Sequence, residues 1–221
     1  MKITRIAIAL LTLALLLTSL IACTETGACD MEAVKGEINS MKVDDFTETA
    51  KKTEYVKFTV KDHGEFVVRL RADVAPITVE NFQKLVSEKF YDGLTFHRIM
   101  KGFMIQGGDP EGTGAGGSKD TIKGEFSQNG VKNELSHIPG VISMARRSTP
   151  LDSASSQFFI VNDERSVSLD GGYAAFGYVV AGYDVILSIS DVRVTYNVYG
   201  TEKSVPVDRV VIEKVCFVTK K

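Results

Sequence analysis

Alternating apolar and polar residues predict a β-hairpin between Val56 and Leu70. Val56, Phe58 and Val60 alternate with polar neighbours, and the pattern resumes from Phe66 to Leu70. Successive side chains of a strand point to opposite faces, so each run buries one face. The turn residues Asp62-His63-Gly64 between the runs favour an antiparallel pair.

Helical spacing predicts two helices. Pro76 is a favourable first residue for the earlier one, whose apolar side chains recur every three to four positions at Val79, Phe82, Leu85 and Val86. The second is expected over residues 183–189.

Short apolar runs bounded by Gly, Pro, Asn or Asp predict further strands at residues 94–99, 103–106, 141–144, 157–161 and 174–180, with a long β-rich segment over 206–218. Strands outnumber helices and do not alternate with them regularly. This pattern favours an antiparallel barrel or sandwich flanked by two helices.

The first residues have the pattern of a signal sequence. Lys2 and Arg5 precede an apolar run from Ile6 to Leu17, which is short for a membrane span. Leu20-Ile21-Ala22-Cys23 resembles the lipobox of prokaryotic lipoproteins, in which the cysteine becomes the lipidated first residue. We therefore expect an extracytoplasmic, membrane-anchored protein with a signal peptide at 1–22; an uncleaved anchor is the alternative.

Residues 23–52 are interpreted as the lipidated Cys23 and a polar tether, and residues 53–221 as the folded domain. Apolar residues at Met31, Val34, Ile38 and Met41 have roughly helical spacing, so the tether is either a frayed helix or disordered. Cys29 and Cys216 are expected to be free thiols, although an oxidising compartment would allow them to pair if the chain ends meet.

Composition limits the partners that we expect. The 26 Lys and Arg residues nearly balance the 28 Asp and Glu residues, and no basic cluster offers a nucleic-acid surface. The three histidines lie far apart without ligands at metal-binding spacing, so no metal site is expected. Residues 112–117 match G-x-G-x-x-G, but no helical pattern follows, which indicates a mobile surface loop.

Polar residues within predicted strands are the candidates for chemistry. Period-two geometry predicts that Phe96 and Arg98 share one face while His97 points to the other, and that Met104 lies beside Gln106. A second such face carries Gln157, Phe159 and Val161. Spacing alone favours Arg98 as a surface charge on an edge strand and Phe103, Met104 and Phe159 as ordinary core, because these are the commoner fates of such residues.

Several segments, taken in their order along the chain, resemble the cyclophilin peptidyl-prolyl isomerases. They are Phe96-His97-Arg98-Ile99, Gly102-Phe103-Met104-Ile105-Gln106-Gly107-Gly108-Asp109, Gly114-Ala115-Gly116-Gly117, Gly124-Glu125-Phe126, Ser143-Met144-Ala145, Ser156-Gln157-Phe158-Phe159-Ile160, Leu169-Asp170-Gly171 and Phe176-Gly177. Their order and spacing match from about Thr53 to Phe217. The resemblance implies a mainly β fold, a closed eight-stranded antiparallel β-barrel capped by two α-helices.

The resemblance also implies roles for residues. Arg98 would be the catalytic arginine, and Gln106 would position the substrate backbone. The substrate-binding residues would be Phe103, Met104, Ala145, Arg146, Gln157, Phe159, Leu169 and Tyr173. No cofactor is implied, and the partners would be proline-containing polypeptides.

Two positions depart from many eukaryotic members of the family. Ser168 stands where they have Trp, and Tyr173 where they have His. We therefore expect weak binding of cyclosporin.

The function expected from the resemblance is isomerisation of X-Pro bonds in exported or envelope polypeptides, assisting their folding. The alternative is a non-catalytic chaperone or scaffold module that grips proline-containing segments. A Ser-His-Asp hydrolase ranks third, because triads assemble in space but the chain has no G-x-S-x-G motif.

Overall fold

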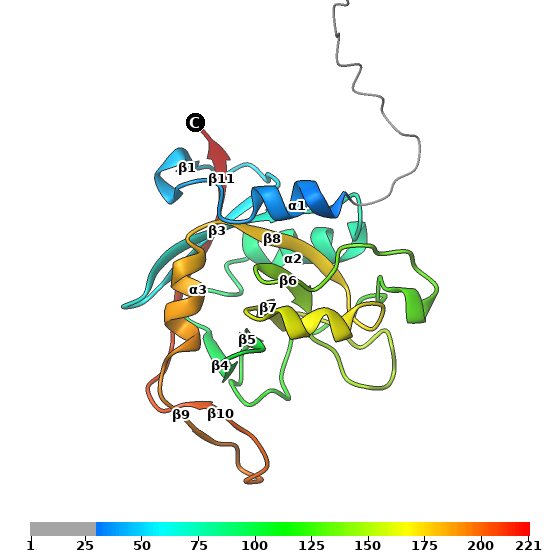
Figure 1. The fold of residues 1–221 in the computed structure, drawn as a ribbon, viewed down its shortest axis with the longest axis vertical. Coiled ribbons are helices and arrows are strands. Elements are labelled where there is room, and N and C mark those ends of the chain that lie inside the picture. The colour runs from blue at the N-terminus through cyan, green and yellow to red at the C-terminus, as the bar shows by residue number, and fades with distance from the viewer. Residues whose placement is uncertain (1–29) are drawn as a thin grey trace, which may run out of the picture.

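The computed structural model describes residues 30–221 and shows a large antiparallel sheet with helices packed around it (Figure 1). The sheet strands are β1 (Phe46–Glu48), β2 (Tyr55–Val60), β3 (Gly64–Leu70), β4 (Thr95–Met100), β5 (Met104–Asp109), β6 (Val141–Met144), β7 (Phe158–Val161), β8 (Ala175–Ala181) and β11 (Ile212–Lys220). The helices are α1 (Met31–Glu37), α2 (Pro76–Ser87) and α3 (Tyr183–Ser190), and a separate hairpin contains β9 (Val194–Tyr196) and β10 (Lys203–Pro206).

The sheet confirms the mainly β, antiparallel fold but not the eight-stranded closed barrel. Its order is β1-β11-β2-β3-β8-β6-β7-β5-β4, so the part of the chain that the structure describes has nine strands in this sheet and three α-helices. The additional strand is β1, which pairs with the end of β11. The start of β4 meets the chain before β11 through an isolated bridge between Thr95 and Val211, not through a paired strand.

Aromatic side chains fill the space between the sheet and α2. Phe58 and Phe66 face each other across the predicted hairpin, with ring centroids 4.7 Å apart. Phe158 of β7 packs edge-on against Phe58 and against Phe82 of α2. The predicted apolar stripe of α2 is buried, as its spacing requires.

The buried Glu125 caps α2 from a distant loop. Its carboxylate accepts hydrogen bonds from the backbone N–H groups of Ile77 and Thr78, which have no partner within the first turn of a helix. A negative charge there also complements the helix dipole. The segment Gly124-Glu125-Phe126 therefore anchors α2 to the loop that follows β5.

Residues 30–48, assigned from sequence to the tether, pack on the folded domain. Asp30 caps α1, and Val34 is almost completely buried against the core. The backbone N–H groups of Asn39 and Met41 donate to the carbonyls of Val179 and Val180. Of the two alternatives for this segment, the structure has the helix, and the packed unit starts upstream of Thr53.

The predicted signal peptide at 1–22, Cys23 and Cys29 lie outside the described residues. Cys216, on β11, is partly buried. Within residues 30–221, no helix is long and apolar enough to span a bilayer.

Glu37 connects α1 to the sheet, and we expect Glu37→Gln to lower the free energy of unfolding by roughly 1–2 kcal/mol at neutral pH. Its carboxylate accepts hydrogen bonds from Arg69 Nη1 and from the Tyr178 hydroxyl. Burial alone would raise the pKa of Glu37, but these bonds hold it below its ordinary value. The stabilisation is therefore present above the pKa of the unfolded chain and is lost as the pH falls.

Urea unfolding at neutral pH and at about pH 3, below the unfolded carboxyl pKa, measures this difference. Glu32→Gln is the matched control, because Glu32 lies on the same helix and pairs only with the exposed Lys35. An equal unfolding midpoint for Glu37→Gln and the wild type would contradict the assigned role.

Candidate active site

A pocket of about 280 Å³ brings together nine of the ten residues expected at the catalytic and substrate-binding site. It is lined by Arg98, Phe103, Met104, Gln106, Gly114, Ala145, Arg146, Phe159, Leu169 and Tyr173. The tenth residue, Gln157, lies in the adjoining cavity and hydrogen-bonds to Gln106. Residues as far apart in sequence as Arg98 and Tyr173 therefore line one pocket.

The floor of the pocket is a small apolar cluster separate from the main core. Met104, Phe159 and Val161 are buried in it, and Leu169 and Tyr173 pack against them. Phe159 meets Tyr173 edge-on, with ring centroids 5.7 Å apart. This floor suits a small apolar ring, because it offers apolar contacts without a buried donor that would be left unpaired.

A β-bulge directs Arg98 into the pocket. In the pairing of β4 with β5, Phe96 lies opposite Gly107 and Arg98 opposite Gln106, so His97 is an extra residue on β4. The alternation shifts by one position there. Phe96 is in the main core while Arg98 lines the pocket, and the expectation that they share a face is wrong.

Gly107 makes room for the bulged strand β4 to pass close to β5. A Cβ at that position would lie 3.1 Å from the Thr95 carbonyl oxygen and 3.2 Å from the Phe96 ring. Glycine opposite the bulged strand is the one signal in the sequence that could have indicated the irregularity.

Arg98 is held from two sides. Its Nη1 donates to Gln106 Oε1 over 3.0 Å, while its Nε and Nη2 each donate to a different carboxylate oxygen of Glu202 over 2.7 Å. The hydrogen bond from Arg98 is the main cause that lowers the pKa of Glu202 to about 2, so the carboxylate is charged at neutral pH. Sequence analysis missed Glu202, because it lies 104 residues from Arg98 and no local pattern links them.

A hydrogen-bonded chain connects Arg98 to the glycine-rich loop. Gln106 Nε2 donates to Gln157 Oε1, and Gln157 Nε2 donates to the carbonyls of Gly114 and Gly116. Asp109 fixes the other side of the loop by accepting from several of its backbone N–H groups. The loop predicted to be mobile is therefore hydrogen-bonded to residues of the site through both its N–H groups and its carbonyls.

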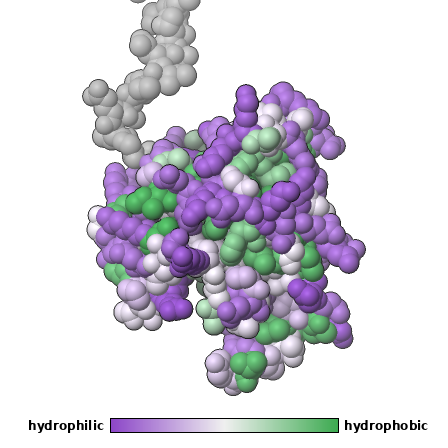
Figure 2. All heavy atoms as spheres, turned by 180° about the vertical axis from the view of Figure 1, so that it is seen from behind, coloured by the Kyte–Doolittle hydropathy of each residue, from purple (hydrophilic) through white to green (hydrophobic). Residues whose placement is uncertain are grey.

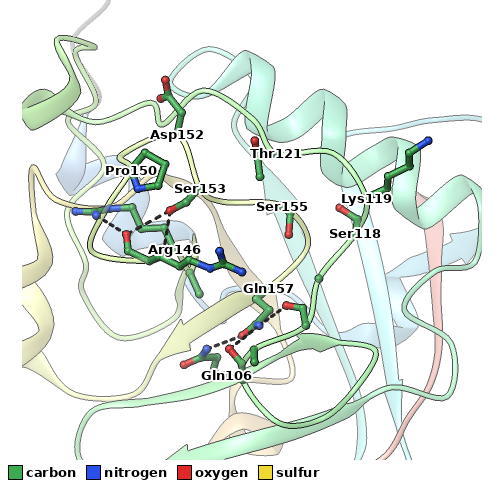
Figure 3. Close-up of a pocket in the computed structure, with 16 residues that line it drawn as sticks. Gln106, Ser118, Lys119, Thr121, Arg146, Pro150, Asp152, Ser153, Ser155 and Gln157 are labelled. Carbon is green, nitrogen blue, oxygen red and sulfur yellow. Dashed lines mark hydrogen bonds between the residues drawn. The ribbon is translucent and has the colours of Figure 1, made fainter.

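The adjoining cavity, of about 350 Å³, continues the pocket past Gln106 and Ala145 (Figure 3). Its lining is polar and includes Lys119, Arg147 and Asp152. Between the two cavities lies Arg146, whose guanidinium stacks on Phe126 and Tyr173 at 4.8 and 4.9 Å from the ring centroids. An extended peptide with an apolar ring in the first cavity could place a neighbouring side chain in the second.

A serine, a histidine and an aspartate do form a hydrogen-bonded chain, as a hydrolase would require. His137 Nε2 lies 3.0 Å from Ser143 Oγ, and its Nδ1 lies 2.7 Å from Asp170 Oδ1. Ser143 and His137 are, however, buried, and the His137 ring stacks beneath Phe159. A nucleophile must reach its substrate, so this chain supports the pocket floor and the hydrolase interpretation fails.

His97 contributes no charge to the site. Burial lowers the pKa of its imidazole in spite of the neighbouring Asp109, which keeps it neutral at physiological pH. It lines a separate cavity with Asp109 and Pro206. Within residues 30–221, no group of His, Cys, Asp and Glu side chains is arranged to hold a metal ion.

Comparisons with known proteins agree with this geometry. The family model "Cyclophilin type peptidyl-prolyl cis-trans isomerase/CLD" matches residues 55–216. Peptidyl-prolyl cis-trans isomerase B of Bacillus subtilis is 42% identical over 140 residues, which cover 63% of this chain and 92% of the relative. The Escherichia coli protein of the same name is 40% identical over 162 residues, covering 70% and 94%.

The fold is also similar to that of a solved structure. A cyclophilin-type peptidyl-prolyl cis-trans isomerase of Cryptosporidium parvum, crystallised in the presence of the dipeptide Ala-Pro, superposes with a TM-score of 0.66 at 27% identity. The match covers 75% of this chain and 99% of that one.

Proposed function

This chain belongs to the cyclophilin-type peptidyl-prolyl cis-trans isomerases, and on that basis we propose that Arg98 catalyses rotation of X-Pro bonds in polypeptides bound across the pocket. The observation that carries the proposal is one guanidinium nitrogen, Nη1, held beside an apolar pocket by Gln106.

The reaction needs no bond to be made or broken. Rotation interrupts amide resonance, which imposes a barrier of roughly 18–20 kcal/mol. In the twisted transition state the proline nitrogen becomes pyramidal and regains its lone pair. A donor aimed at that nitrogen binds the transition state more tightly than the planar ground state, and this difference lowers the barrier.

Arginine suits this task because its guanidinium stays charged at any working pH and presents several donors. Glu202 occupies Nε and Nη2, which leaves Nη1 as the nitrogen beside the pocket. The proline ring would rest on Met104 and Phe159, which form the apolar floor of the pocket. No step requires a proton transfer.

Gln106 and nearby backbone would hold one flank of the peptide while the other rotates. The backbone N–H of Ala145 already donates to the carbonyl of Gln157. The carbonyl oxygen of Ala145 is therefore the backbone group that this residue can offer to the substrate. Arg146, braced against Phe126 and Tyr173, would form the wall beside it. The residue next to the proline would extend into the adjoining polar cavity.

Arg98→Ala is expected to lower the rate of catalysed X-Pro exchange by about 100-fold or more, the cost typical of removing one preorganised donor. NMR exchange spectroscopy on a proline-containing peptide measures this rate directly. Arg193→Ala removes an exposed arginine and is the matched control. If wild type and Arg98→Ala both bind the peptide and neither accelerates exchange, the protein is a binding module.

We further propose that the enzyme acts on exported or envelope polypeptides, assisting their folding while anchored to a membrane through a lipid on Cys23. The lipobox-like residues 20–23 support this proposal. Figure 1 shows α1 and the β9–β10 hairpin at opposite ends of the molecule, and the hairpin contacts Arg98. An anchor upstream of α1 would thus join the domain at the end opposite to this hairpin.

Expression in a lipoprotein-producing bacterium with labelled palmitate tests the anchor. The wild type is expected to take up the label and partition into detergent, whereas Cys23→Ala is not. Cys29→Ala, which removes a neighbouring cysteine, should behave as the wild type. Equal labelling of wild type and Cys23→Ala would refute lipidation at this residue.

Cyclosporin is expected to bind weakly, because Ser168 leaves the pocket rim beside Leu169 without a large aromatic side chain. Ser168→Trp should lower the Kd about tenfold, or ~1.4 kcal/mol. Calorimetric titration measures the change. Val167→Trp, which places the same ring one residue earlier on the exposed turn, is the control. An unchanged Kd in Ser168→Trp would count against this placement of the rim.

A further inference from the structure

The hairpin of β9 and β10 leaves the body of the molecule between α3 and β11. It pairs only within itself, with Tyr196 opposite Lys203, and is not part of the nine-stranded sheet. Figure 1 shows it as a projection at the lower end of the molecule, and Figure 2 shows apolar side chains near its tip. One side of it, β10, lies against β4, the strand that contains Arg98.

Glu202 is the hairpin residue that reaches the active site. It precedes β10, and its two carboxylate oxygens each accept one hydrogen bond from the Arg98 guanidinium, at 2.7 Å. This bidentate geometry matches a planar guanidinium to a planar carboxylate and restricts rotation of both. The two side chains are each about 30% exposed, so solvent screens the pair only in part.

The hairpin holds Glu202 in place independently of Arg98. Its backbone carbonyl accepts from the N–H of Asn197 across the turn, over 2.8 Å. A hydrogen bond from the buried Ser204 supports its carboxylate. The acceptor is therefore preorganised before substrate binds, which is the condition under which it can orient another group at little cost.

Glu202 acts on the site from outside the pocket. The residues that line the pocket include Arg98 and Gln106 but not Glu202. Gln106 holds Nη1 from the pocket side, while Glu202 holds Nε and Nη2 from the other side. Without Glu202, the flexible arginine side chain would keep only its hydrogen bond to Gln106 and weak contacts with the sulfurs of Met100 and Met104.

We propose that Glu202 is a positioning residue for the isomerase reaction: it clamps the guanidinium of Arg98 so that Nη1 points at the proline nitrogen. This role rests on the proposed catalytic role of Arg98. An opposite, inhibitory role would require the pair to withdraw the guanidinium from substrate. The geometry opposes that role, because the nitrogen beside the pocket is the one that Glu202 does not bind.

Glu202→Gln keeps the size of the side chain and removes its charge and one acceptor oxygen. In the full-length protein we expect kcat to fall by about tenfold or more, since small displacements of a catalytic group are costly. KM should stay within about twofold, because Glu202 does not line the pocket. Glu202→Asp, which retains the carboxylate, should recover part of the loss.

Asp208→Asn is the matched control, since it removes an exposed carboxylate from the chain just after the hairpin. The NMR signal of the Arg98 Nε–H group reports directly on its hydrogen bond to Glu202. If Glu202 only stabilised the fold, this signal would not change in Glu202→Gln. Its exchange with water should be slow in the wild type and in Asp208→Asn and fast in Glu202→Gln. The remaining backbone spectrum should be unchanged outside the hairpin and β4.

A double-mutant cycle separates this inference from the proposed function. In an Arg98→Lys background, Glu202→Gln should have little further effect on kcat, because the guanidinium that it positions is absent. If Arg98→Ala is inactive while Glu202→Gln is as active as the wild type or more active, the positioning role is wrong and the catalytic role of Arg98 stands. If Arg98→Ala is fully active, the catalytic role itself fails.

Discussion

The β-bulge at His97 is the constraint on which the active site depends. Regular alternation would bury Arg98 on the same face as Phe96, where a charge without a partner is costly. The extra residue reverses the side on which Arg98 emerges, while Phe96 and Ile99 both stay in the core. The bulge therefore places a guanidinium at the surface of β4 without loosening the core beneath it.

The sheet serves two apolar clusters at once. In β7, Phe158 packs into the main aromatic core, while its neighbour Phe159 forms the floor of the pocket. Behind that floor, the buried His137, hydrogen-bonded to the buried Ser143 and to the exposed Asp170, fixes the ring of Phe159 from below. A rigid floor matters here because a catalyst that only stabilises a twisted geometry must hold its substrate ring in one place.

Loops, the β9–β10 hairpin and α1 supply contacts that the strands of the sheet do not. The glycine-rich loop is joined to Gln106 through Gln157, the hairpin of β9 and β10 supplies Glu202, and α1 braces the far side of the sheet through Glu37. Each of these contacts is a hydrogen bond or an ion pair between segments distant in sequence. Such pairs position groups with more directional precision than apolar contacts do, which explains their concentration around the site and at the edge of the fold.

Local patterns in the sequence determined the hairpin of β2 and β3, the helices α2 and α3 and most of the strands, because burial of one face imposes a period on the residues that form them. The pocket residues were predicted from the resemblance to the cyclophilin family. The bulge, the extra strand β1, the burial of Ser143 and the contact of Glu202 with Arg98 were decided only in the tertiary structure. Each depends on which distant segments meet, and neither period nor spacing along a chain contains that information.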